Sequence, residues 1–146
     1  MFNQLAKHRV NTSKLPTFDL PEIGEGAGII VAMAGESNVD YFRAVLKQTP
    51  SDKGSRKKKK NEVVEISPAE VKKQRGIDRN MFGKHVVKGF TKIIDDKAVT
   101  VVFNEENAIT LMNALPDWLF DELRTYCTNV SNFTDFEIDV DEKVKN

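Results

Sequence analysis

The chain has 146 residues, of which 40% are hydrophobic and 30% charged, and its 22 basic and 22 acidic side chains balance to zero net charge. This length predicts one domain whose core needs neither a disulfide nor a metal, and the zero net charge excludes a general attraction to nucleic acid or an anionic membrane. The lone Cys127 excludes a disulfide framework, and apolar runs such as residues 29–31 are far too short to span a membrane. Because residues 1–15 lack the apolar core of a secretory signal, we expect a cytosolic protein.

The N-terminal part predicts a loose arm followed by two short strands. Residues 1–14 are polar and weakly patterned. Phe18 and Leu20 then alternate with polar neighbours, and residues 29–33 form an apolar run after three closely spaced glycines. This pattern indicates two strands joined by a glycine loop, not a phosphate-binding loop, because no Lys-Ser/Thr ending or helix follows the glycines.

Two helices are predicted on either side of a lysine-rich stretch. The first covers residues 37–48, with Ser37 as its N-cap and Asp40 at the capping-box position. The second starts with Ser67 as N-cap and Pro68 at its first position, and Gly76 is its predicted stop.

Between these helices, residues 51–61 predict a mobile basic loop. The stretch has no apolar residue before Val63 to anchor it, and its charges repel one another. The cluster could contact a polyanion, but it lacks the aromatic residues that stack bases, so a solvated loop is the favoured interpretation. The basic residues concerned are Arg56, Lys57, Lys58, Lys59 and Lys60.

Residues 85–103 predict a β-hairpin. Residues 85–94 have an extended pattern, Asp95 and Asp96 supply turn chemistry, and residues 99–103 are a second β-branched run. On this interpretation His85 is a half-exposed strand residue with no catalytic or metal-binding partner.

Two short helices are predicted after the hairpin. Asn104 is a suitable N-cap for the first, and Pro116 ends it because proline lacks an amide hydrogen and disfavours a helical residue before it. Asp117 is the predicted N-cap of the second helix, which runs through Cys127. We expect Phe133 to fold back onto this helix pair. We also expect Trp118 to stay partly exposed, because so small a core cannot hold both Trp118 and Phe120.

Together these elements predict an α+β fold: small N-terminal strands and a central β-hairpin packed with short helices, with a helical C-terminal end. The predicted organisation is a flexible arm at residues 1–14, a single globular domain at residues 15–134, and an acidic tail at residues 135–146. The mobile basic loop at residues 51–61 lies within the domain.

No catalytic constellation stands out in the sequence. Nucleophile motifs, metal-binding histidine pairs and complete phosphate loops are absent from it, so we expect neither a metal nor a cofactor, and not an enzyme. Cys127 lies on an apolar helical face, where a buried and inert thiol is the favoured interpretation. What remains is a group of large apolar side chains near the C-terminal end. Each alone is best explained as core, but as a cluster they are candidates for binding a partner helix: Leu115, Trp118, Leu119, Phe120, Tyr126 and Phe133.

The sequence resembles the tail assembly chaperones of long-tailed bacteriophages over about two thirds of its length. The resemblance lies in these segments: Asp78-Arg79-Asn80-Met81-Phe82, His85-Val86-Val87-Lys88-Gly89-Phe90, Val102-Phe103-Asn104-Glu105-Glu106-Asn107, Leu115-Pro116-Asp117-Trp118-Leu119-Phe120-Asp121-Glu122-Leu123, Ser131-Asn132-Phe133 and, upstream, residues 18–26 and Tyr41-Phe42. Two departures are present. The family tends to have Trp in place of Phe90, and it tends to have Gly in the hairpin turn, where this chain has Asp96-Lys97.

The resemblance implies a function without a reaction. Such chaperones act in the host cell cytoplasm, where many copies coat the helical tape-measure protein before tail tube protein polymerises around it, and they are absent from the finished particle. It therefore implies the tape-measure protein and tail tube protein as partners, together with self-association of the coat. It implies no membrane.

Two other interpretations stay open. One is a structural phage protein, such as a head–tail connector or a tail-associated subunit, that uses the same apolar surface but remains in the virion. The other is a small nucleic-acid-binding protein that uses residues 56–60.

Overall fold

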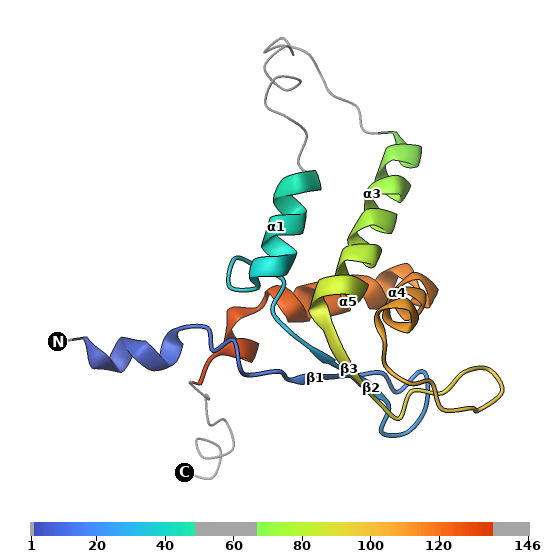
Figure 1. Cartoon of the computed structure of the whole chain (residues 1–146), viewed down its shortest axis with the longest axis horizontal. Coiled ribbons are helices and arrows are strands. Elements are labelled where there is room, and N and C mark those ends of the chain that lie inside the picture. Colours follow the sequence, from blue (N-terminus) through green and yellow to red (C-terminus); the bar gives the residue numbers. More distant parts are fainter. Residues whose placement is uncertain (1, 49–66, 136–146) are drawn as a thin grey trace.

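The computed structural model of the chain describes residues 2–48 and 67–135. Within them, a three-stranded antiparallel sheet packs against helices, which confirms the predicted α+β class (Figure 1). The basic loop predicted at residues 51–61, and the tail from residue 136 onward, lie outside the described residues.

The sheet has the order β1-β2-β3, formed by β1 (Thr17–Asp19), β2 (Gly28–Val31) and β3 (Val87–Thr91). The predicted pair of N-terminal strands is confirmed, with Phe18 opposite Ile29. In β2, Ile29 and Val31 are fully buried, and Phe90 of β3 lies opposite Ile29. The central strand is therefore the apolar one, as burial between two neighbours requires.

The predicted β-hairpin at residues 85–103 is confirmed only around its turn. Val87–Thr91 pairs with β2, and residues 99–103 form no strand, but the segment after β3 turns back through an antiparallel bridge between Ile94 and Thr100 and a hydrogen bond from the Val101 amide to the Ile93 carbonyl. A short turn does connect them: Asp95 Oδ1 accepts from the backbone amides of Lys97 and Val99 at 2.9 and 3.0 Å. The pairing of β3 with β2 is accompanied by burial of Val87.

Helix α1 (Val39–Gln48) starts later than predicted. Asn38, and not Ser37, caps it, since Asn38 Oδ1 accepts from the Tyr41 amide at 3.2 Å. The Ser37 hydroxyl instead donates to Met33 Sδ at 3.6 Å. Tyr41 fixes the helix to the core through an edge-on contact with Phe82, whose ring centroid lies 5.8 Å away.

Helix α3 (Pro68–Met81) begins as predicted, with Ser67 Oγ accepting from the Glu70 amide at 3.2 Å, but Gly76 does not end it. The helix continues to Met81 and passes into η2 (Phe82–Val86), a single π-helical segment that leads directly into β3. His85 therefore lies in η2, half-buried, and not in a strand. The helix survives Gly76 because Phe82 and Val86, beyond it, are buried in the core.

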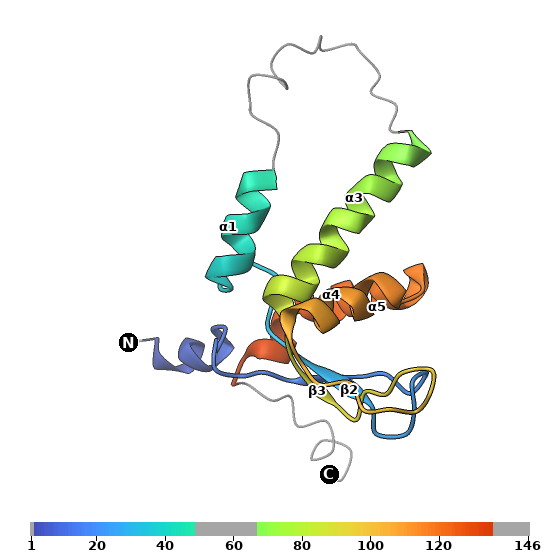
Figure 2. The ribbon, with the colours of Figure 1, turned by 45° about the vertical axis from the view of Figure 1, so that its right-hand side comes forward.

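Helices α4 (Glu105–Ala114) and α5 (Asp117–Thr128) form the other layer of the core, and the short η3 (Val130–Phe133) closes it. Asn104 caps α4 as predicted, its Oδ1 accepting from the Asn107 amide at 2.7 Å. Phe120, Leu123 and Phe133 are buried, so Phe133 does fold back as expected. Figures 1 and 2 show α1 and α3 rising from this core on the side away from the sheet.

The N-terminal arm has more structure than its composition predicted. Residues 3–8 form the 3-10 helix η1 (Asn3–His8), which buries no side chain. Beyond it, Val10 forms an isolated bridge with Thr134, and the Asn11 amide donates to the Phe133 carbonyl at 2.7 Å. Residues 10–11 are thus held against the C-terminal end of the fold, while residues 2–9 protrude (Figure 1).

Two helical glycines give a stability prediction. A Cβ added at Gly76 meets nothing within 4 Å, whereas one at Gly83 lies 2.6 Å from Ile109 Cα. Gly76→Ala should therefore raise the free energy of unfolding by about 0.5–1 kcal/mol, because it removes a flexible residue from a helix. Gly83→Ala should lower it by roughly 1–3 kcal/mol, because η2 and α4 must move apart. Urea unfolding of both variants checks this, and a loss of stability in Gly76→Ala would contradict it.

Candidate protein-interaction surfaces

The α4–α5 junction is the feature around which the exposed surfaces lie. Leu115 is extended (φ −66°, ψ 136°) and Pro116 has the N-cap position of α5, so the predicted break is confirmed. Proline cannot continue the hydrogen-bond ladder of α4, and it disfavours a helical Leu115. The last carbonyls of α4 are then left without intrahelical donors.

Arg79 of α3 supplies those donors. Its guanidinium donates to the Met112 carbonyl, to the Leu115 carbonyl at 2.7 Å and to Asp117 Oδ1 at 2.6 Å, and it lies 4.8 Å from the centre of the Phe120 ring. The side chain is almost fully buried. The Arg79 guanidinium thus donates hydrogen bonds both to carbonyls at the end of α4 and to the first residue of α5, because its planar group carries several N–H donors.

The predicted role of Asp117 as N-cap is therefore wrong. No side chain caps α5, and the Asp117 carboxylate pairs with Arg79 and lies 3.8 Å from Arg75. As the first residue of α5 it still places negative charge where the helix dipole favours it. The sequence analysis gave Arg79 no role of its own, although the spacing of Arg75, Arg79 and Phe82 puts all three on one helical face.

Removing Arg79 should destabilise the fold. Arg79→Met leaves the buried carbonyls of Met112 and Leu115 without donors, so we expect a loss of roughly 2–4 kcal/mol in the free energy of unfolding. Arg75→Met is the matched control. It removes partly exposed ion pairs to Asp117 and Asp121, which contribute less than about 1 kcal/mol. Equal losses in the two variants, measured by denaturant unfolding, would contradict this account of Arg79.

The structure separates the six predicted partner-binding residues. Leu115, Leu119, Phe120 and Phe133 are buried in the core, although Leu115 and Leu119 also line cavities described below. The Phe120 ring packs edge-on against Phe82, with 5.2 Å between centroids.

The other two residues are accessible to different degrees. Tyr126 is half-buried between Phe18 and Phe133, at centroid distances of 5.4 and 6.3 Å. Trp118 alone is exposed, at 54%, which matches the expectation that so small a core cannot hold it. The basic residues 56–60 lie outside the described residues.

An open cavity of about 920 Å³, here called the α3 cleft, lies between α3 and the α4–α5 junction. Val71, 45% exposed, and Gly76 line it from α3, and Pro116 and Asp117 line it from the junction. Trp118 directly follows these two residues. The cleft has the mixed composition of a protein-binding surface, with apolar contacts beside Lys72 and Arg75.

A second cavity of about 450 Å³, here called the α4 groove, lies on the other side of the junction, and Leu115 and Pro116 line both. Its apolar lining comes from β3, the following turn and α4: Phe90, Ile93, Ile94, Val101 and Leu111. Nearby, Val99, Val102 and Phe103 are exposed. These three residues belong to the predicted second strand of the hairpin, and no feature of the sequence indicates that they border a groove.

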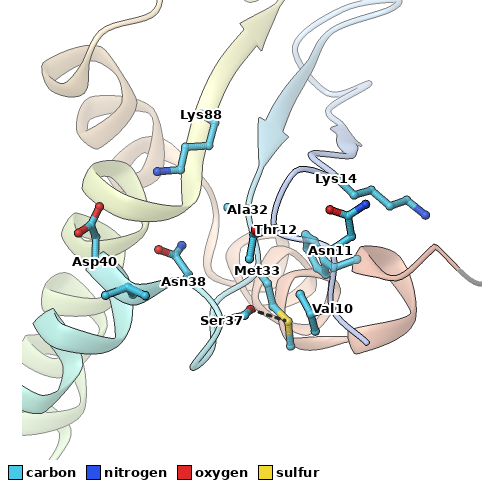
Figure 3. A pocket seen from close by; sticks show the side chains of 12 residues that line it. Val10, Asn11, Thr12, Lys14, Ala32, Met33, Ser37, Asn38, Asp40 and Lys88 are labelled. Atoms are coloured by element: carbon cyan, nitrogen blue, oxygen red, sulfur yellow. Dashed lines mark hydrogen bonds between the residues drawn. The ribbon is translucent and has the colours of Figure 1, made fainter. Parts of the chain in front are cut away.

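A third cavity, of about 200 Å³, is small and has a mixed polar and apolar lining (Figure 3). Lys14 and Lys88 lie on opposite sides of it, and Asn38, which donates to the His85 carbonyl at 2.9 Å, holds α1 against η2 there. Its side chains serve the packing of α1 and assemble no reactive group.

The described residues contain no group of three or more His, Cys, Asp or Glu side chains able to hold a metal ion. Over the same residues, no helix is long and apolar enough to cross a bilayer. Burial raises the pKa of the Cys127 thiol to about 12, so the group stays protonated at neutral pH and is a poor nucleophile. This confirms the expected buried cysteine.

Comparison with known proteins gives one match. A family model described as YdaY prophage protein matches residues 36–146. The comparisons found no matching curated protein and no matching solved structure. The match covers α1 and every later element, and with them the whole lining of the α3 cleft. It covers the lining of the α4 groove except Glu22 and Ile23.

Proposed function

This chain belongs to the YdaY family of prophage proteins, and on that premise we propose that it is a tail assembly chaperone that binds and coats the tape-measure protein. The proposed role has no chemical reaction. In it, many copies keep a long helical chain soluble in the host cytoplasm and then give way to tail tube protein.

The observation that carries the proposal is the exposure of Trp118, which directly follows Pro116 and Asp117 of the α3 cleft lining. Tryptophan offers a large apolar area with little side-chain entropy to lose, and it is enriched among the residues that dominate binding energy. A cleft between two helices suits an amphipathic helix, whose apolar face recurs every three to four residues. The tape-measure protein implied by the resemblance is such a helical chain.

The arrangement also fits a reversible coat. Val71 is the exposed large apolar side chain that lines the cleft, and the exposed Trp118 follows the lining residues Pro116 and Asp117 in the chain, so we expect each copy to make a weak contact. Many weak contacts along one chain add up to stable coverage, yet each copy can still be displaced. A structural tail subunit would use the same surface but stay in the particle, and mass spectrometry of purified virions distinguishes the two functions.

Two substitutions separate binding from folding. Trp118→Ala should weaken binding to a purified helical segment of the tape-measure protein by roughly thirtyfold, or about 2 kcal/mol, with little change in stability. Leu123→Ala, in the core, should lower the free energy of unfolding by roughly 2–5 kcal/mol and leave the affinity of the folded fraction intact. Calorimetric titration and urea unfolding measure the two effects. If Trp118→Ala destabilised the protein and left affinity unchanged, Trp118 would be a core residue and the proposal would fail.

A further inference from the structure

We propose that the α4 groove of one copy takes the N-terminal arm, residues 2–9, of a second copy. This contact is separate from the α3 cleft and needs no tape-measure protein. It therefore goes beyond the proposed function and can be tested without it.

The arm is an exposed helical segment that carries large apolar side chains. All of residues 2–9 are exposed in the structure, including the large apolar side chains of Phe2 (65%) and Leu5 (53%). Exposed apolar residues at a spacing of three, on a helix that buries nothing, are typical of a segment that docks elsewhere.

The charges of the arm and the groove are opposite. The first acidic residue of the chain is Asp19, whereas Lys7, Arg9 and Lys14 precede it. The charged residues that line the α4 groove are Glu22, Asp95 and Asp96, all of them acidic. Apolar residues on the arm would meet the apolar floor while its cations meet the acidic rim, which is the complementarity that specific interfaces use.

The acidic rim is available for such a contact. Within residues 2–48 and 67–135, none of Glu22, Asp95 and Asp96 forms an ion pair. The side chain of the nearby Lys92 packs against Gly26, where its Cδ lies 3.2 Å from the position that a Cβ on Gly26 would take. Lys92 does not line the α4 groove. The rim therefore keeps net negative charge.

The positions of the two surfaces require two copies. The N-terminal helix and the turn at residues 92–103 lie at opposite ends of the molecule in both views (Figures 1 and 2). Because arm and groove are different surfaces, the contact is head-to-tail and can add copy after copy. Eight residues bury less than the roughly 800 Å² per partner of a stable interface, so each contact is weak and depends on concentration.

The test is sedimentation velocity of the full chain over roughly 1 μM to 1 mM, with three variants. A chain that begins at Val10 loses the arm but keeps the Val10–Thr134 bridge. The double variant Lys7→Glu with Arg9→Glu reverses the charge of the arm. The double variant Glu22→Lys with Asp96→Lys reverses the charge at two positions of the groove rim. Asp95 is left unchanged because it holds its own turn.

We expect wild type to associate as concentration rises, and each variant to associate about tenfold more weakly with an unchanged melting temperature. Mixing the two charge-reversed proteins should restore association, because each reversed surface then meets its complement. A wild type that stays monomeric throughout the range would overturn the proposal. So would association that the truncation leaves unchanged, or a mixture that gives no recovery.

Discussion

The rest of this structure depends on the hydrogen bonds and the ion pair of the buried Arg79 guanidinium. Pro116 ends α4 and leaves its last carbonyls without intrahelical donors, and Arg79 supplies donors to Met112 and Leu115 while pairing with Asp117. A hydrophobic side chain in its place could fill the volume but could not satisfy buried carbonyls. The angle between α4 and α5, and the distance of α3 from both, are therefore set by one planar group with donors in three directions.

The same junction organises the exposed surface. Leu115 and Pro116 line both the α3 cleft and the α4 groove, and Trp118 follows on the outside because the core is already filled by Phe82 and Phe120. A sheet of three short strands buries one apolar layer and no more, so additional large side chains remain accessible. The two surfaces proposed here as docking sites in a prophage protein, the α3 cleft and the α4 groove, therefore meet at this junction.

Local signals in the sequence were sufficient for much of this fold. The caps at Ser67 and Asn104, the break at Pro116 and the two N-terminal strands each depend on neighbouring residues, and each was predicted. The pairing of β2 with β3 was not predicted, because nearly sixty residues separate the two strands and no local signal connects them. Gly76 predicts a helix end because glycine is a common C-cap residue, and the core contacts that continue α3 past it are long-range and leave no local signal. For the site, the exposure of Trp118 and the packing of Phe133 onto the helix pair were predicted from the sequence, whereas the role of Arg79 is visible only in three dimensions.

Hydrogen–deuterium exchange of the full chain, alone and with a purified tape-measure segment, tests the central claim most directly. The claim is that a helical partner lies in the α3 cleft beside Trp118. It predicts slower exchange on binding at residues 68–79 and 113–121, with α1 and η3 unchanged, because only the first two segments border the cleft. Binding that slows exchange at α1 or η3 and leaves residues 113–121 unprotected would contradict it.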